Sequence, residues 1–527
     1  MRLSPTNVPL TVKSFDKQSC GLCAGCGCSC GYILYTKRGR IVDLYGHPAD
    51  PNGVGSLCTK GITYIQALDT NPLRLKGAYL KEGESYREIP IEEALIVAKE
   101  KLTGKRLAFL LDRSAGLEEY ILASKITDLV FSDAPYVPFR ASSLRPQDWK
   151  DRRFILSIEA DPVFSEVMST RWIVDAVEKG SYLYVMSSKF GTVCAKAKES
   201  HLLSPYDIVH LLEGTLDVES NDPHARSLRR NLQLIKPSLV LIGSCMIASP
   251  FKNKILKFLK EARTKFRIDY ALVGDIMPFP SKGIKELCDA LDEFDSLVVF
   301  GNALRFLKDD HLEKLKNKFV LHFTLFPNLT AHYAHLVLPT QNFTERDFIN
   351  YRHGFGFLTY SPKTLSRDGY VNPYEFLSEV FKVDVNVGEF LKSYGVDYEE
   401  LKREGIQDLK LPTVENLPLS YEDEAFKNGI YIYTDSGLVE ELGHWHTWTH
   451  DMEKYQVAYI NEKTAKELGL KGSLPINGCE FRLNVTPNVA EHVIFISSSY
   501  EEYQPFDPGV SVGRFLKQPY YRFEVLE

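Results

Sequence analysis

The sequence predicts an α/β protein in three parts: a cysteine-rich N-terminal unit, a central region of parallel sheets, and a C-terminal β-barrel unit. Three observations support this division. Six of the ten cysteines lie before residue 60, short apolar runs alternate with helical stretches through the middle of the chain, and strand-like runs return near its end. We therefore predict domains at 1–75, 76–428 and 429–527.

Length and composition are those of a globular protein and exclude some function classes. The chain has 527 residues, a formal net charge of −6, 44% hydrophobic residues and 25% charged residues. This length is typical of two to four structural units, and no basic stripe suggests a nucleic-acid partner. No apolar run reaches the roughly 20 residues that span a bilayer, and the first residues, MRLSPTNVPL, lack the apolar core of an export signal. We expect a cytoplasmic protein with no direct membrane span.

The N-terminal unit centres on its cysteines. QSCGLCAGCGCSCG (18–31) holds five of them, and Cys58 follows later. GYILYTKRGRIVDLYG (31–46) alternates around Arg38 and Gly39 in the pattern of a β-hairpin. Disulfide frameworks belong to short secreted chains, so the cysteine cluster indicates a metal site. The four remaining cysteines are far apart, which is typical of buried small hydrophobic residues.

The central region alternates strands and helices, which predicts parallel sheets with crossover helices. The predicted strands are 107–112, 154–160, 182–188, 239–244, 296–302 and 319–326. Helical stretches such as DIVHLLEG (207–214) and NKILKFLKEARTKF (253–266) lie between them. The segment 375–425 is polar and rich in Glu, Lys and Pro, and we interpret it as an irregular connection.

Strand signals return in the C-terminal unit. They are IYIYTD (430–435), CEFRLNV (479–485) and HVIFISSSY (492–500), with one helix at NEKTAKELGL (461–470). Short strands so close together favour a closed β unit.

Two sets of four cysteines can be drawn from the N-terminal unit. Cys20-x2-Cys23-x2-Cys26-x3-Cys30 has the spacing of a bacterial ferredoxin run. In ferredoxins, however, the fourth cysteine of such a run serves a second cluster, and this chain has no second run. The other set replaces Cys20 with Cys58, which follows Cys30 after 27 residues. Thiolates suit iron–sulfur clusters and zinc alike, so ligand type does not decide between these metals.

The surroundings of the second set resemble a known family. CAGCGCSCGYILYTKRGRIVDLYGHPADPNGVGSLCTKG (23–61) is similar to the N-terminal cluster domain of the molybdopterin oxidoreductase superfamily. That superfamily includes formate dehydrogenases, nitrate reductases and the large iron–sulfur subunit of respiratory complex I. The resemblance implies one [4Fe–4S] cluster held by Cys23, Cys26, Cys30 and Cys58, with zinc as the minor alternative. Cys20 and Cys28 fall outside this set, and Cys28 stands in the place of a small residue.

Lys60 lies two residues after the last of these cysteines. In catalytic members of the family, a lysine at this place lies between the cluster and the pterin. The resemblance therefore implies that Lys60 is an electron relay if a pterin is bound. The alternative is a surface lysine whose charge offsets the negative charge of the cluster.

The resemblance extends through the central region and implies nucleotide-binding-like domains. Family members carry a Gly-x-Asn-Pro turn after the first strand, where this chain has Glu-Ala-Asp-Pro (159–162). Gly and Asn permit close backbone approach, whereas the carboxylates of Glu159 and Asp161 would face the pyrophosphate of a guanine dinucleotide unfavourably. The second strand ends in Ser-Ser-Lys (187–189), where the family has Asp-Pro-Arg.

The second half of the chain matches the family better. Gly301 and Asn302 keep the second nucleotide turn, and the loop GHWHTWTHDM resembles one in which His446 and Thr447 face the pterin. The resemblance thus gives these four residues as candidates for binding the cofactor. The alternatives are an ordinary left-handed turn at Gly301 and an aromatic loop held by its tryptophans.

The stretch PYVPFRASSLRPQDW (135–149) corresponds to the active-site loop of formate dehydrogenase-like members. There the Cys or selenocysteine that ligates the metal follows an arginine, whereas this chain has Ser142 and Ser143 after Arg140. Serine ligates molybdenum in some relatives, so Ser142 is a catalytic candidate only if a metal is bound. The lost cysteine and the altered first turn together indicate a pterin site that no longer works.

Two functions follow from this resemblance. The first is an iron–sulfur electron-transfer or scaffold subunit of a multi-subunit oxidoreductase complex. The alternative is a formate-dehydrogenase-like enzyme with a Mo- or W-bis-pterin guanine dinucleotide, and a zinc-stapled interaction protein is a minor third. Because the sequence shows one cluster and no flavin or nicotinamide fingerprint, we expect partner subunits with iron–sulfur, flavin or quinone-linked centres. Such a complex would be cytoplasmic or peripheral to a membrane, without nucleic acid.

Overall fold

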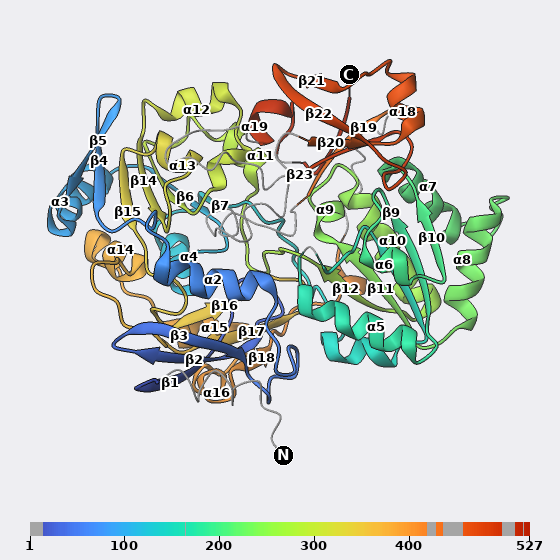
Figure 1. Cartoon of the computed structure of the whole chain (residues 1–527), viewed down its shortest axis with the longest axis horizontal. Coiled ribbons are helices and arrows are strands. Elements are labelled where there is room, and N and C mark those ends of the chain that lie inside the picture. The colour runs from blue at the N-terminus through green and yellow to red at the C-terminus, as the bar shows by residue number, and fades with distance from the viewer. Residues whose placement is uncertain are drawn as a thin grey trace.

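The fold was analysed in a computed structural model, which describes residues 14–163, 165–418, 428–435, 457–497, 512–519 and 521–526. Figure 1 shows the cysteine-rich unit at the bottom, one α/β unit above it on the left, the other α/β unit on the right, and the C-terminal sheet at the top. Within these described ranges, no helix combines the length and the apolar character needed to cross a membrane.

The N-terminal unit is a three-stranded antiparallel sheet followed by one helix. Its elements are β1 (Lys17–Leu22), β2 (Gly31–Lys37), β3 (Arg40–Gly46) and α2 (Thr59–Thr70). The hairpin predicted from the sequence is confirmed: β2 and β3 join at Arg38 and Gly39, which have φ angles of 49° and 74°. Two successive residues with positive φ form the turn whose twist matches that of the flanking strands.

A seven-stranded sheet forms the α/β unit on the left of Figure 1. Its strand order is β5-β4-β15-β14-β13-β6-β7, with all pairs parallel except the β4–β5 edge hairpin and its contact with β15. The strands are β4 (Ala78–Glu82), β5 (Ser85–Ile89), β6 (Leu107–Leu111), β7 (Val130–Ser132), β13 (Ser296–Phe300), β14 (Phe319–Thr324) and β15 (Leu336–Pro339). The helices are α3 (Ile91–Leu102), α4 (Leu117–Ile126), α11 (Ile284–Asp289), α12 (Asp309–Leu315) and α13 (Leu329–Tyr333).

A second sheet of five parallel strands is inserted between β7 and β13, in the order β10-β9-β8-β11-β12. The strands are β8 (Phe154–Ile158), β9 (Tyr182–Ser187), β10 (Glu199–Leu202), β11 (Ser238–Gly243) and β12 (Asp269–Val273). The helices are α5 (Thr170–Glu178), α6 (Thr192–Lys196), α7 (Pro205–Leu216), α8 (Pro223–Leu234), α9 (Ser244–Ile247) and α10 (Lys252–Phe266). The predicted parallel α/β arrangement is therefore confirmed.

The interpretation of 375–425 as an irregular connection is wrong over the part that the structure describes. This part contains α14 (Pro373–Phe381), α15 (Val387–Ser393), α16 (Tyr398–Glu404) and β18 (Ile406–Asp408), and β18 pairs with β17 (Phe357–Ser361), which pairs with β16 (Phe348–Asn350). Each helix begins at a side-chain cap, provided by Asn372, Asn386 and Asp397. Such caps satisfy the free N–H groups of a first turn. The polar composition reflects the solvent-facing sides of short helices whose buried sides join the core of the seven-stranded unit.

The C-terminal unit is a six-stranded half-barrel sheet in the order β21-β22-β20-β23-β19-β24. Its strands are β19 (Tyr431–Asp435), β20 (Val457–Ile460), β21 (Ser473–Ile476), β22 (Cys479–Val485), β23 (Val493–Ser497) and β24 (Phe523–Val525), with helices α18 (Glu462–Glu467) and α19 (Val512–Phe515). Alternate side chains of a strand face opposite sides of a sheet. Accordingly, Tyr431 and Tyr433 pack into the core of the five-stranded unit, and Ile432 packs into a core shared with the seven-stranded unit. This sheet therefore joins the two α/β units.

Candidate functional site

The loop between β1 and β2 and the residue before α2 bring four thiols together. Cys23, Cys26 and Cys30 are buried in the loop, and Cys58 is half-buried immediately before the helix. The Cys23 N–H donates to the Cys30 carbonyl over 2.9 Å, which closes the loop. The Gly25 and Gly61 N–H groups donate to the Cys23 and Cys58 sulfur atoms, both over 3.4 Å. The structure thus assembles the predicted ligand set with N–H groups directed at two of its sulfur atoms.

Burial makes these thiols poor anions unless a cation is present. Burial, and next to it the nearby Cys26, raises the pKa of Cys58 to about 11, although the backbone at Gly61 and the Lys60 ammonium act against this rise. Burial and the charges of Cys26 and Cys58 likewise raise the pKa of Cys23. A metal centre supplies the positive charge that such thiolates need.

The thiols do not have the spacing of an occupied zinc site. Four thiolates on one tetrahedral zinc, at Zn–S distances near 2.3 Å, lie about 3.8 Å apart. Among the described residues, no three cysteine thiols lie within 4.8 Å of one another. The thiols as placed here are therefore not drawn together around a single tetrahedral ion.

The two cysteines left outside the predicted set have different surroundings. Cys20 is exposed on β1, opposite Ile33 of β2, so it does not join the buried thiols. Cys28 is fully buried, and its thiol lies close enough to those of Cys26 and Cys30 to influence their pKa values. Asn52 holds the loop here, because its amide donates to the Cys28 carbonyl over 2.8 Å. Cys28 thus lies against the cluster site, a contact that its sequence position did not reveal.

Helix α2 connects the cluster site with the interior. Lys60 is in its first turn and is 4% exposed, so the surface alternative for this lysine is wrong. The positive charge of Lys60 acts on Cys58 and on the buried carboxyl of Glu166. Tyr64, one turn further, lines the interior cavities described next. Residues four apart share one face of a helix, so α2 directs Lys60 and Tyr64 to the same side.

Two adjoining cavities lie where the carboxyl ends of the two α/β sheets meet. Their volumes are about 120 Å³ and about 90 Å³, and Tyr64, Asp112 and Arg113 line both. The residues of the larger cavity that follow strand ends are Asp112 (β6), Asp133 (β7), Glu159 (β8), Ser244 (β11) and Gly274 (β12). The carboxyl ends of parallel strands are the usual place for ligands in α/β sheets. The fold therefore positions a ligand site here, next to the cluster domain.

Partly buried ion pairs hold charged residues that line the larger cavity. Arg113 donates to Asp275 over 2.7 Å, and Arg352 donates to Asp133 over 2.6 Å and to Asp275 over 2.9 Å. Arg352 is 1% exposed. These pairs neutralise two of the cavity's carboxylates with arginine charges, so those arginines are committed to protein partners.

Glu159 is turned away from the position that the sequence predicted for it. It has a left-handed backbone, with φ of 47°, and is 5% exposed. Its carboxylate accepts from the Ser188 N–H over 2.5 Å, from the Ser188 hydroxyl, and from the Ser187 hydroxyl over 3.2 Å. Burial raises the pKa of Glu159 to about 7. Glu159 therefore binds the end of β9, and at neutral pH it carries only part of a charge.

Asp161 occupies a backbone N–H group at the same turn. The Val163 N–H donates to one oxygen of its carboxylate over 3.2 Å, whereas the other oxygen has no hydrogen-bond partner among the described residues. Burial raises the pKa of Asp161, and the backbone at Val163, Thr192 and Val193 acts against this rise. A side chain on Gly191 would lie 2.0 Å from this carboxylate, which shows how closely the turn and α6 approach. The chain's own carboxylate thus lies beside backbone N–H groups of the kind that bind phosphate oxygens.

The second predicted turn has a structural explanation of its own. Gly301 has φ of 62°, and a Cβ atom there would lie 1.6 Å from the Asp112 carboxylate, so only glycine fits. Asn302 is buried and accepts from the Thr330 N–H over 3.2 Å and from its hydroxyl over 3.0 Å. Gly301 lines the smaller cavity. This turn is therefore compatible with both the cofactor-binding hypothesis and its alternative.

Of the remaining predicted residues, Ser142 is not brought to the cavities. Ser142 is fully buried and donates to the carbonyls of Leu144, over 2.5 Å, and Tyr270, over 3.2 Å. It lines neither cavity. His446 and Thr447 lie outside the described residues.

Sequence reasoning missed the two charged residues closest to both parts of the site. Arg113 lines both cavities, and its charge acts on Cys23 and Glu166. Glu166 is fully buried, burial raises its pKa to about 7, and the charges of Arg113 and Lys60 act against that rise. The position of Arg113 just after β6 is a signal that could have identified it, because it follows a parallel strand. Glu166 lies in a polar turn and gives no such signal.

Comparisons with known proteins agree with this geometry. Residues 18–69 match the family described as Molybdopterin oxidoreductase Fe4S4 domain. The whole fold is similar to that of acetylene hydratase from Pelobacter acetylenicus, with a TM-score of 0.67, 14% sequence identity and 96% of each chain covered. At this identity the second similarity shows the fold alone. The first confirms the predicted [4Fe–4S] domain, and the two together confirm the predicted fold class.

Proposed function

We propose that this chain, a member of the molybdopterin oxidoreductase superfamily by its cluster domain and its fold, is an iron–sulfur electron-transfer subunit of a larger oxidoreductase complex. A [4Fe–4S] cluster, when bound, supplies transfer of one electron at a time. Cys23, Cys26, Cys30 and Cys58 would hold it. The single observation that carries the proposal is the turn after β8, where the chain's own carboxylates occupy the groups that a nucleotide phosphate would need.

The argument at this turn is electrostatic. A pterin guanine dinucleotide would bring phosphate charge next to the partly buried Asp161 carboxylate and to the Val163 N–H group that already binds it. Two unit charges 4 Å apart repel by about 4 kcal/mol at an effective dielectric constant of 20. Displacing Asp161 would avoid this repulsion but would leave a partly buried carboxylate without its hydrogen bond. In addition, Ser142 donates to main-chain carbonyls and faces neither cavity. The residues present therefore do not fit a bis-pterin cofactor at the first nucleotide turn.

The alternative function, a Mo- or W-bis-pterin enzyme, is favoured by a different observation. The two cavities lie at the carboxyl ends of both sheets, and Lys60 and Tyr64 lead from Cys58 toward them along α2. Gly301 keeps open the smaller cavity beside Asp112. These features would serve a cofactor whose electrons pass to the cluster.

The proposed role requires partners. With one cluster and no flavin or nicotinamide fingerprint in the sequence, electrons have to arrive from and leave to other redox subunits. We therefore propose iron–sulfur, flavin or quinone-linked partner chains in the cytoplasm, or at the periphery of a membrane complex.

Metal analysis of the native protein, purified without oxygen, separates the two functions. We expect about four Fe per chain, with no Mo, no W and no guanine nucleotide released on acid denaturation. Cys58→Ser should lose the iron and its visible absorption, whereas Cys20→Ser, the matched control at an exposed thiol, should keep both. About two pterin dinucleotides per chain would refute the proposed role and establish the enzyme. Stoichiometric zinc in place of iron would refute both.

A further inference from the structure

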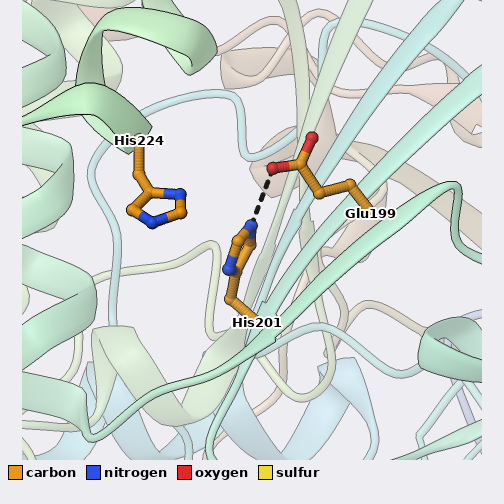
Figure 2. A group of neighbouring side chains, drawn as sticks. All are labelled: Glu199, His201 and His224. Atoms are coloured by element: carbon orange, nitrogen blue, oxygen red, sulfur yellow. Dashed lines mark hydrogen bonds and ion pairs between the residues drawn. The ribbon is translucent and has the colours of Figure 1, made fainter.

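Three side chains of the five-stranded unit form a group of possible metal ligands, far in sequence from the cysteines of the N-terminal unit. Glu199 and His201 come from β10, and His224 comes from the first turn of α8. One ligand atom from each lies within 4.8 Å of the others, and this is the one such group of His, Cys, Asp and Glu residues in the described part of the chain. Figure 2 shows the carboxylate and the two imidazoles gathered around a common space.

The topology explains why these residues meet. Strand β10 is an edge strand, and its residues 199 and 201 are two apart, so their side chains stand on the same face. Helix α8 starts beside that face, and the Asp222 side chain caps it by accepting from the His224 N–H over 2.8 Å. The cap fixes the place from which the His224 side chain extends.

The surroundings orient the ligand atoms. The His201 Nε2 and Glu199 Oε1 atoms lie 2.9 Å apart, and the Tyr182 hydroxyl donates to the other Glu199 oxygen over 2.8 Å. The His201 ring lies against the rings of Tyr184 and His224, each with centroids 5.1 Å away. The side chains of His201 and Glu199 are 22% and 27% exposed. They are thus held in place while remaining open to solvent.

One buried hydroxyl next to this group has no partner. Tyr184 is fully buried, and within the described residues its hydroxyl makes no hydrogen bond. It lies close enough to Glu199 and Asp222 that, after burial itself, the charges of these carboxylates raise its pKa. A buried hydroxyl without a hydrogen-bond partner is costly. A water bound beside Glu199, His201 and His224 would provide that partner.

We propose that Glu199, His201 and His224 form a binding site for a divalent transition metal, zinc in the first place. Two imidazoles and one carboxylate are a ligand set that zinc binds in proteins, with a water in the fourth position. Tyr182 would then act as the outer partner that orients the carboxylate. The metal would link edge strand β10 to α8 and would be separate from the iron–sulfur cluster.

The geometry requires a small closure. Ligands on one tetrahedral zinc at 2.0–2.1 Å lie about 3.4 Å apart, whereas the present ligand atoms lie within 4.8 Å of one another. His224 is exposed, so a change of its side-chain rotamer can supply the difference.

Zinc binding to the full chain tests this site. The protein should carry its iron–sulfur cluster, lack a histidine tag and contain Cys20→Ser, so that an exposed thiol does not compete for zinc. Competition with a chromophoric chelator should detect about one Zn²⁺ per chain. His201→Ala and His224→Ala should each weaken binding at least tenfold, and Tyr182→Phe should weaken it about tenfold to 100-fold. His210→Ala, a control at an exposed histidine of α7, should leave binding unchanged.

Cobalt gives a second readout that does not depend on affinity alone. The difference spectrum of the cluster-loaded protein with and without Co²⁺ should show visible absorption of a nitrogen- and oxygen-ligated ion, without a sulfur-to-cobalt charge-transfer band, and His224→Ala should abolish it. Zinc affinity unchanged in both histidine variants, binding that is equally reduced by His210→Ala, or a sulfur-to-cobalt charge-transfer band in the difference spectrum would each overturn the proposal. Thermal unfolding of each variant without metal confirms that the variants are folded.

Discussion

Replacing Glu159 with glutamine should change how the stability of the protein depends on pH. Glu159 is buried at the turn after β8, and burial raises its pKa from 4.5 to about 7. An acid whose pKa is higher in the folded state than in the unfolded state stabilises the fold most below its unfolded pKa. That contribution is lost as the pH rises from about 4.5 to about 7. Glu159→Gln keeps the shape and the acceptor for the Ser188 N–H but removes the ionisation.

The size of the effect follows from the pKa shift. Each pKa unit is worth about 1.4 kcal/mol, so the wild-type protein should lose about 2.5 kcal/mol relative to the glutamine variant between pH 5 and pH 8. An unfolding entropy of about 2.1 cal/mol/K per residue, applied to 527 residues, gives about 1.1 kcal/mol/K. If the chain unfolds as one unit, the difference in Tm between Glu159→Gln and the wild type should increase by about 2 °C from pH 5 to pH 8.

Scanning calorimetry of the cluster-loaded protein at several pH values measures this difference. Glu178→Gln, at an exposed glutamate of α5, is the matched control and should follow the wild type throughout. Parallel Tm profiles for the wild type and Glu159→Gln would refute the reasoning, because they would mean that Glu159 is ionised in the fold at no cost.

Three further predictions concern the cluster site and the core. Cys28→Ser should keep about four Fe per chain, because serine preserves a hydrogen-bonding group beside Cys26 and Cys30. Iron analysis and the visible absorption spectrum measure this, and loss of iron would instead make Cys28 a ligand. Arg346→Met should lower the free energy of unfolding by about 3–5 kcal/mol, because it leaves the Glu119 carboxylate buried without its ion-pair partner; calorimetry showing no change would contradict this. Leu401→Ala should cost about 2–5 kcal/mol by the same measurement, since this side chain of α16 is fully buried; a neutral effect would mean that α16 is not part of the core.

Local sequence signals were sufficient for the strands and for the cluster loop. The apolar runs that became β8 and β13 are continuous because both faces of these strands are covered. The turn at Arg38 and Gly39 needs only the positive φ angles that two adjacent residues provide. The four candidate ligand cysteines came from the resemblance of residues 23–61 to a known cluster domain, because spacing alone left two sets of four cysteines open.

Features that depend on distant contacts could not be predicted in this way. Ser142 is turned toward main-chain carbonyls by the pairing of its segment with Ala271 of β12, more than a hundred residues away. Glu159 is directed inward by groups at the end of β9. The short helices between α14 and β18 bury only a few side chains each, too few to give a periodic pattern.

The insertion of one α/β unit within the other has a consequence for the order of folding during synthesis. Strand β6 pairs with β13, so Leu107 cannot take its place in the sheet until Ser296 has been synthesised. At about 5–20 residues per second, the ribosome needs about 10–40 s to make the chain between them. All five strands of the inserted sheet emerge during this interval and can pair with one another. The seven-stranded sheet should therefore be completed after the five-stranded sheet. Until then, β6 and β7 form a short apolar strand pair to which a chaperone could bind.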